Sequence, residues 1–138
     1  MPLPNNNAIY TQAGSGLLVY IGIEDNDSGD DINFIVHKII NLRIFNDNHG
    51  KMNLSVVDIN AEIMIVSQFT LCGNTKKGNR PSYMSAMDVE LAKTLYDKFL
   101  DYMNKCYSKV KSGIFQADMN IKLENNGPVT LIIRSQNS

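Results

Sequence analysis

The chain has 138 residues, of which 43% are hydrophobic and 20% are charged. This size and composition predict one globular domain over residues 1–138, because two domains would each be too small to bury an adequate core without disulfides or metals. The 13 basic and 14 acidic residues nearly cancel, which excludes a protein that attracts nucleic acid through its overall charge. Any contact with RNA must therefore come from a local basic patch.

The amino-terminal part of the chain predicts a buried strand followed by a helix. Residues 1–8 are polar and contain two prolines, so we expect them to be loosely ordered. The apolar run at 17–23 is short enough for a buried strand. Ser28 and Asp31 then have the spacing of a helix capping box. The helix that they open carries an apolar stripe that must face a sheet, formed by Ile32, Ile35, Val36, Ile39 and Leu42.

A turn and a second buried strand follow. Residues 46–51 are strong turn formers between two short segments, 43–45 and 52–57. Another continuous apolar run at 61–69 predicts a second buried strand.

A long loop then leads into a second helix. Residues 73–83 are rich in glycine, lysine and asparagine, which is typical of a loop. A helix is expected from about Met87 to Lys105. We expect its apolar face to be formed by Leu91, Leu95, Phe99, Tyr102 and Cys106.

The carboxy-terminal part predicts two more strands. Apolar and polar residues alternate over 119–123, turn formers occupy 125–128, and an apolar run follows at 129–133. Strands would then dominate, with two helices long enough to cover one face of a sheet. The predicted fold class is therefore α/β, a single layered domain that is mainly β with two helices packed on the sheet.

Four segments could carry chemistry, and the first is Ser67–Gly73 at the end of the second buried run. Polar residues at the exit of a buried strand sit where rigid scaffold meets solvent, a favoured place for active groups. Thr70 offers a hydroxyl, and the backbone N–H groups of Phe69 and Thr70 could form an oxyanion hole. From this segment alone, side chains that only satisfy a turn are the favoured interpretation.

The second segment contains Gly127 and Pro128. Glycine lets the backbone approach a ligand closely, and proline permits a cis peptide at a free-energy difference of about 0.5–1 kcal/mol. A simple hairpin turn is the favoured interpretation of this pair by itself.

The third segment is a short basic loop with Lys76, Lys77 and Arg80. It could hold a phosphate backbone, and an ordinary solvated loop is an equally good interpretation. In the fourth segment, Phe115 and Met119 could stack against a base. Core packing is the more common role for both residue types.

Other chemistries find little support. His37 lies in the first predicted helix and His49 in a turn, and neither has partners in a triad pattern. We expect no metal and no cofactor, because metal-ligand spacing is missing and the glycines at 14–16 precede a strand instead of a helix. Cys72 is expected to be an inert, partly buried thiol.

The expected compartment follows from the same absences. The start of the chain lacks the layout of a signal peptide, and no apolar run approaches the roughly 20 residues that span a bilayer. We therefore expect a cytoplasmic protein without a membrane contact, in which Cys72 and Cys106 are reduced thiols.

Taken in order, the segments resemble the D-aminoacyl-tRNA deacylase (D-tyrosyl-tRNA deacylase) family. The similar blocks run from about Ile9 to Ile133. They are GSGLLVYIGI, LRIFNDNHGKMNLSV, IVSQFTL, GNRPSY, TLYDKF, FQADM and NNGPVT. The resemblance implies an ester hydrolase for translation quality control, which releases a D-amino acid from tRNA and accepts glycyl-tRNA mischarged on tRNA-Ala.

The resemblance also implies a homodimer. In it, Gly127–Pro128 would be cis and inserted into the partner's active site, where the two carbonyls capture the α-amino group. Parallel carbonyls would leave room for a side chain on only one face of the α-carbon, so an L-residue is excluded by steric clash.

For the chemistry, the resemblance implies that N–H groups around Phe69 and Thr70 stabilise the oxyanion, with each donor contributing about 2.7–4 kcal/mol. Thr70 as a nucleophile would need a base that the sequence does not show. Instead, the 2′-hydroxyl of the terminal adenosine would help to activate water, while Ser67 and Gln68 position the ester and ribose. The adenine would contact Phe115 and Met119, and the tRNA backbone would contact Lys76, Lys77 and Arg80.

Two departures from the family pattern stand out. The first strand of the family, of roughly ten residues, is apparently missing, which predicts an exposed sheet edge or a disturbed core. Gln116 occupies a position where the family usually has a small residue.

Three alternative functions remain open. They are a catalytically impaired tRNA-binding protein on the same fold, an editing enzyme for L-amino acids, and an interaction domain without an RNA partner.

Overall fold

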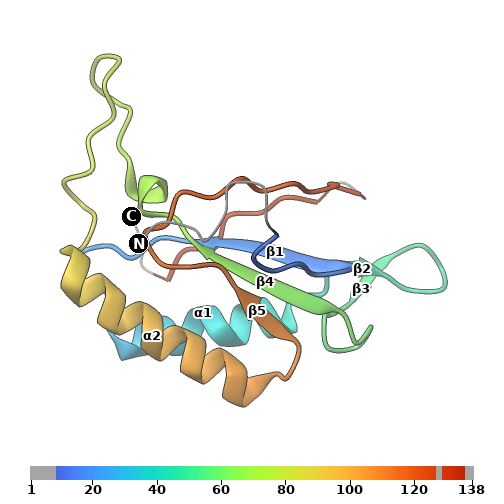
Figure 1. Ribbon diagram of the computed structural model, residues 1–138. Helices are drawn as coiled ribbons and strands as arrows, with labels where there is room; N and C mark the ends of the chain where they lie inside the picture. The colour runs from blue at the N-terminus through green and yellow to red at the C-terminus, as the bar shows by residue number, and fades with distance from the viewer. Residues whose placement is uncertain (1–8, 127–128, 136–138) are drawn as a thin grey trace.

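The computed structural model describes residues 9–126 and 129–135 (Figure 1). Its centre is a parallel sheet of three strands in the order β1 (Gly16–Ile21), β4 (Glu62–Ser67) and β5 (Val110–Ser112). Helices α1 (Gly29–Asn41) and α2 (Val89–Cys106) contact each other and cover one face of the sheet (Figure 1). The predicted α/β class, with two helices packed on a sheet, is confirmed.

Helix α1 begins as its sequence predicts. The Ser28 N–H donates to the Asp31 carboxylate at 2.8 Å, which is the backward half of a capping box. Val36 and Ile39 of the predicted apolar stripe are fully buried in the core. Burial of each such side chain stabilises the fold by about 1.5–3 kcal/mol, which is how a helix of 13 residues is held on the sheet.

Helix α2 has the predicted bounds to within two residues, but it buries a different face. The core residues are Tyr96, Phe99 and Met103, whereas Leu91 is 62% exposed and Cys106 is also exposed. The buried stripe is thus displaced by one residue from the predicted one, and only Phe99 belongs to both. Both stripes are apolar at helical spacing, so the choice is made by packing: Tyr96 stacks near Phe99 and Phe115.

The predicted turn at 46–51 joins two short antiparallel strands, β2 (Phe45–Asn46) and β3 (Met52–Leu54). The Asp47 carboxylate accepts the N–H groups of His49 and Lys51 at 2.8 and 3.0 Å. These hydrogen bonds to the charged form hold the pKa of Asp47 below its usual value. Gly50 adopts a φ of 75° in the turn, a conformation that glycine reaches without steric penalty.

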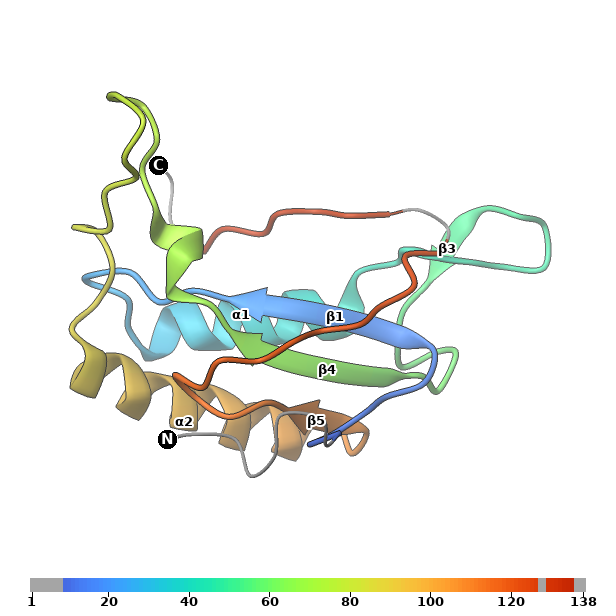
Figure 2. The same ribbon diagram turned by 45° about the horizontal axis from the view of Figure 1, so that its top comes forward.

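The prediction of two carboxy-terminal strands, at 119–123 and 129–133, is wrong. Among the described residues, segments 118–126 and 129–135 form no ladder and no backbone hydrogen bond. Segment 118–126 is extended across the face of the sheet that the helices do not cover, and 129–135 is extended beside β1 (Figures 1 and 2). The alternating sequence specifies an extended chain, but a strand also needs the backbone of a neighbour at bonding distance, and none lies there.

The first apolar run is less buried than predicted. Leu17, Leu18 and Val19 are only half-buried, and Tyr20 is 42% exposed. The reason is that β1 has β4 on one side and no strand on the other within the described part of the chain. The expected exposed edge is therefore present, whereas Ile63 and Ile65 of the central β4 are fully buried.

Candidate active site at the carboxyl end of the sheet

Three segments, two of which carry candidate residues, meet at one end of the molecule. Because β1, β4 and β5 are parallel, the residues that follow each strand emerge at the same end of the sheet. The Gln68 N–H donates to the Ile21 carbonyl at 2.7 Å, and the Gly113 N–H donates to the Ile65 carbonyl at 2.9 Å. These bonds tie residues 22–27, 67–72 and 113–119 to the ends of neighbouring strands (Figure 2).

The first candidate segment turns sharply after β4. Residues Phe69–Cys72 form a single 3-10 turn, η1, in which the Leu71 N–H bonds to the Gln68 carbonyl. A helix leaves its first N–H groups without a partner inside the helix. Accordingly, the N–H groups of Phe69 and Thr70 bond to no other described residue. Both residues are exposed at the strand end.

The side chains around η1 are held in place by one another. Gln68 donates its amide N–H to the Thr70 hydroxyl, which fixes the Thr70 side chain. The Phe69 ring, 62% exposed, packs edge-on against Tyr83 with centroids 5.2 Å apart. No histidine or carboxylate bonds to Thr70 among the described residues, so the geometry offers no base that would make its hydroxyl a nucleophile.

Tyr83 is a site residue that could not be identified from the sequence. Its ring covers Phe69 and closely approaches Gly73, where an added Cβ would lie 2.9 Å from the ring. Ser85 Oγ donates to the Cys72 carbonyl at 2.9 Å and fastens the returning loop to η1. The only available signal was the Tyr in the block GNRPSY, which carries no indication of what the ring contacts.

Cys72 has the properties of an inert thiol. It is buried, and its Sγ lies 3.6 Å from the Ile23 carbonyl, to which it donates. Burial, with a smaller contribution from the carboxylates of Glu24, Asp27 and Asp25, raises the pKa of Cys72 to about 11. At neutral pH the nucleophilic thiolate is therefore scarcely populated, and the expectation of an unreactive thiol is supported.

The two histidines lie outside the candidate site. The His37 ring bonds to the Tyr102 hydroxyl at 2.9 Å, which links the two helices, and His49 is exposed in the β2–β3 turn. Within residues 9–126 and 129–135, no three His, Cys, Asp or Glu side chains are grouped to hold a metal ion. The described helices include none that is long and apolar enough to span a bilayer.

The basic residues lie on a finger that begins directly after η1. Two backbone hydrogen bonds between Asn74 and Ser82, of 2.7 and 2.9 Å, close the base of the finger. Residues 75–81 extend away from the body of the protein (Figures 1 and 2). Lys76, Lys77 and Arg80 are all exposed, and neither of the two ion pairs in the described part of the chain involves them.

Phe115 and Met119 are positioned mainly by packing. The Phe115 ring lies against Tyr96, with centroids 5.4 Å apart, and is half-buried beside the core. The Met119 side chain fills the space where Gly113 has no Cβ. Between them, the Ala117 N–H bonds to the Ile114 carbonyl and forms a turn in which Gln116 has a φ of 64°. Both residues thus follow β5 at the site end of the sheet, but neither ring nor thioether is free of protein contacts.

Gly127 and Pro128 lie outside the described residues, so the predicted cis peptide is not tested. Their neighbours are informative. Segment 118–126 runs along the sheet toward the β2–β3 hairpin, and 129–135 returns beside β1 (Figure 2). A hydrogen bond of 3.3 Å from Asn125 to Thr130 joins the two segments. The described chain on both sides of the Gly-Pro pair is therefore at the end of the sheet opposite to η1.

Comparison with known proteins identifies the family to which this chain belongs. The family model described as "D-Tyr-tRNA(Tyr) deacylase" matches residues 3–134, and the chain belongs to that family of tRNA deacylases. It is 52% identical over 133 residues to the D-aminoacyl-tRNA deacylase of Azobacteroides pseudotrichonymphae genomovar. CFP2, covering 96% of this chain and 89% of that one. The sequence-based recognition of the D-aminoacyl-tRNA deacylase family is thus confirmed.

Three further similarities, one to a curated relative and two to solved structures, bear on this assignment. A Bacillus subtilis (strain 168) protein, 51% identical over 128 residues with 93% and 97% coverage of the two chains, is named an inactive D-aminoacyl-tRNA deacylase. Among solved structures, the c-Myc DNA unwinding element binding protein has a TM-score of 0.82 at 41% identity, covering 86% and 81% of the two chains. A probable eukaryotic D-amino acid tRNA deacylase shares the fold, with a TM-score of 0.74 at 24% identity over 91% and 88%.

Proposed function

We propose that this protein hydrolyses the ester bond between a D-amino acid, or a misplaced glycine, and the 3′ end of tRNA, including glycine mischarged on tRNA-Ala. The observation that carries the proposal is the pair of backbone N–H groups, unbonded among the described residues, at the exposed residues Phe69 and Thr70 that follow the buried strand β4. Curated relatives about 50% identical are named for this activity, and we place the reaction in the cytoplasm.

The chemistry follows from the two donors. Water adds to the ester carbonyl carbon, and the resulting oxyanion accepts hydrogen bonds from the Phe69 and Thr70 N–H groups. The bond to the ribose oxygen then breaks, a proton passes to that oxygen, and the amino acid leaves as a carboxylate. Because Thr70 has no base beside it, the ribose 2′-hydroxyl assists the attacking water, and Ser67 and Gln68 orient the ester.

In this proposal, residues of a partner subunit discriminate between D- and L-amino acids. The described segments beside Gly127–Pro128 lie opposite to η1, so a protomer does not readily complete its own site, whereas a twofold dimer brings one end to the other. A cis Gly-Pro pair from the partner would present two carbonyls to the substrate amine. The acceptor end of tRNA would stack near Phe115 and Met119, and its backbone would follow Lys76, Lys77 and Arg80.

The oxyanion role is tested by replacing Phe69 with proline. Proline is tolerated at the first position of a helix, and Gln68 already has the extended backbone that precedes a proline. The change removes one N–H without breaking a hydrogen bond between described residues. We expect kcat on D-tyrosyl-tRNA to fall by about 10²–10³-fold.

Two control variants separate the backbone from the side chains. Phe69→Ala keeps the N–H and loses the ring, and Thr70→Val keeps the N–H and loses the hydroxyl. Both should retain most of the kcat, and a loss in Thr70→Val as large as in Phe69→Pro would instead assign the chemistry to the hydroxyl. L-tyrosyl-tRNA serves as the substrate control, because its turnover would indicate an editing enzyme for L-amino acids.

The shared site is tested by mixing two inactive variants. Phe69→Pro subunits and subunits with Pro128→Ala are each expected to be inactive as homodimers. After random exchange, half of the dimers carry one intact site, so about a quarter of the sites should recover. No recovery, in a sample whose exchange is verified by mass, would place both motifs in one subunit.

A second candidate function is tRNA binding without catalysis on the same fold. It is favoured by the Bacillus subtilis relative, which is named inactive although this chain covers 97% of its length. Saturable binding of D-tyrosyl-tRNA without hydrolysis at enzyme concentrations above the substrate concentration would select this alternative. Single turnover under the same conditions would exclude it.

A further inference from the structure

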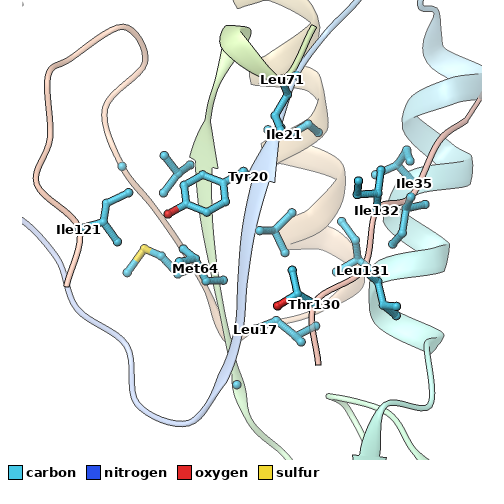
Figure 3. A pocket seen from close by; sticks show the side chains of 18 of the residues that line it. Leu17, Tyr20, Ile21, Ile35, Met64, Leu71, Ile121, Thr130, Leu131 and Ile132 are labelled. Atoms are coloured by element: carbon cyan, nitrogen blue, oxygen red, sulfur yellow. The ribbon is translucent and has the colours of Figure 1, made fainter. Parts of the chain in front are cut away.

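The two exposed apolar side chains of η1 point to different parts of the surface. Leu71 lines the pocket along β1, where it lies beside Ile21 (Figure 3). Phe69 does not line that pocket, and its ring is 62% exposed. It packs edge-on against the ring of Tyr83, which is itself 39% exposed. Phe69 and Tyr83 thus form a surface aromatic pair that is separate from the apolar pocket.

The aromatic pair is held in a fixed position. The ring centroids are 5.2 Å apart, and the ring planes make an angle of 65°. The Tyr83 ring also lies against Gly73, where an added Cβ would come within 2.9 Å of it. The Ala86 N–H donates to the Tyr83 carbonyl at 3.0 Å, and the neighbouring Ser82 is bonded to Asn74. Exposed rings that are already fixed lose little conformational freedom when a ligand binds, which favours binding.

The pair lies between the two places where we expect tRNA to contact the protein. Phe69 is the first residue of η1 and carries one of the two backbone N–H groups at which we place the ester. Tyr83 is the first residue after the closed base of the finger, which carries the three cations that we assign to the phosphates. If the proposed function holds, on which this inference rests, the unpaired end of tRNA passes the pair between the finger and η1.

The charges on the two sides of the pair differ in sign. The finger on one side carries three exposed cations. On the other side, the Asp25 N–H donates to the Ser85 carbonyl at 2.8 Å, and Glu24 forms an isolated β-bridge with Ala86. The acidic segment 24–27 therefore lies against the loop that follows the pair, and its Glu24 and Asp25 are exposed. Because carboxylates repel phosphates, this distribution of charge directs an RNA backbone to the finger side.

We propose that the aromatic pair is a stacking site for the unpaired nucleotide that precedes the terminal adenosine of tRNA. Proteins that bind single-stranded nucleic acid combine a basic surface for the backbone with exposed aromatic rings for the bases. The finger and the pair supply these two parts side by side, and edge-on packing of the two rings leaves ring faces open for a base. Stacking accepts any base because each has a π face, so the site holds the acceptor end without reading its sequence.

The test uses the full chain and deacylated tRNA in which 2-aminopurine replaces the base next to the terminal adenosine. The fluorescence of 2-aminopurine is quenched when its ring stacks on an aromatic side chain, and we expect saturable quenching by the wild type. Tyr83→Leu should remove most of the quenching and weaken the affinity about five- to a hundredfold, which corresponds to the loss of one base–aromatic stack. Tyr83→Phe keeps a ring and should retain both the quenching and most of the affinity.

Two controls separate stacking from other contributions. Phe34→Leu removes a ring that is 45% exposed on α1 beside Lys38, and it should change neither the quenching nor the affinity. The slope of log affinity against log salt should be the same for Tyr83→Leu and the wild type, because stacking releases no counterions. A reduced slope in Tyr83→Leu with intact quenching would mean that Tyr83 only supports the finger, and would overturn the proposal.

The remaining outcomes also decide the question. Absence of quenching by the wild type, or equal quenching by the wild type and Tyr83→Leu, would overturn the proposal. If Tyr83→Leu does not fold, Phe69→Leu takes its place, because it keeps the η1 N–H and removes a mostly exposed ring; unchanged quenching would then refute the stacking site. Hydrolysis of unlabelled D-tyrosyl-tRNA is measured separately. Quenching without hydrolysis would refute only the proposed reaction, and hydrolysis without quenching would refute only the stacking site.

Discussion

At the scale of single residues, Tyr96 carries a polar group that the core does not use. Its side chain is 2% exposed, and its hydroxyl bonds to no described residue. A buried polar group without a partner lowers the free energy of unfolding by about 1–3 kcal/mol. We therefore expect Tyr96→Phe to raise the midpoint of urea unfolding. Tyr107→Phe is the matched control and should lower it, because the Tyr107 hydroxyl donates to the Ala61 carbonyl.

The same hydroxyl makes stability depend on alkaline pH. Burial raises the pKa of Tyr96 to about 12 from its ordinary value of 10.0. Between these two values the unfolded chain loses the tyrosine proton while the folded chain keeps it, so stability falls as pH rises. Below pH 10 the contribution is constant. Unfolding of the wild type at pH 9 and pH 11 should show this loss, and Tyr96→Phe should remove most of it.

Gln116 has a backbone conformation that disfavours a residue with a side chain. It occupies the third position of a turn with a φ of 64°, where glycine is strongly favoured. A side chain in this region costs about 1–2 kcal/mol, and the greater freedom of glycine in the unfolded chain offsets part of the gain. Gln116→Gly should therefore raise the free energy of unfolding by up to about 1 kcal/mol. Gln116→Ala keeps the strain and should change little.

At the scale of elements, the start of β1 depends on the absence of a side chain. An added Cβ at Gly16, which has a φ of 157°, would lie 1.8 Å from the Glu62 carbonyl oxygen on β4. The backbone cannot yield without separating the two strands. We expect Gly16→Ala to destabilise the fold by about 2–4 kcal/mol in urea unfolding. Gly29→Ala, where the Cβ meets nothing within 4 Å at the first turn of α1, should stabilise it by up to about 1 kcal/mol.

Some secondary-structure elements could be predicted from the sequence, and others could not. Ser28 and Asp31 predicted the start of α1 because a capping box is a local interaction, complete within four residues. The 119–123 and 129–133 strands were predicted wrongly, because alternation does not reveal whether a neighbouring backbone is present. The buried face of α2 was displaced by one residue for a similar reason, since only contacts such as Tyr96 with Phe115 decide between two apolar stripes.

In the candidate site, too, some features could be predicted from the sequence and others could not. The position of Ser67–Thr70 at the end of a buried strand was predictable, because an apolar run and the polar residues after it are visible in the sequence. The two free N–H groups were not, since they depend on the 3-10 turn that follows. Tyr83 was missed because it is distant along the chain and reaches Phe69 only through the base of the finger formed by Asn74 and Ser82.

At the scale of the whole molecule, a net charge of −1 means that tRNA affinity depends on where the cations are placed. Lys76, Lys77 and Arg80 lie together on the finger that begins after η1, whereas Lys38 lies on α1 and Lys93, Lys98 and Lys105 are distributed along α2. Each phosphate contact contributes about 0.7–0.9 to the slope of log affinity against log salt. Replacing the three finger residues with glutamine should therefore reduce that slope by about 2–3, measured by filter binding of tRNA.

A second triple variant with the same change in net charge shows whether tRNA binding depends on the position of the cations or on their number. Lys93, Lys98 and Lys105 all lie on α2, and their replacement with glutamine alters the net charge by the same three units. If tRNA responds only to overall charge, both triple variants should weaken binding equally. If the finger seats the phosphates, the α2 variant should keep nearly the wild-type slope. The comparison is decisive for this fold because its surface has no general excess of positive charge, so a local contact is the only electrostatic route to tRNA.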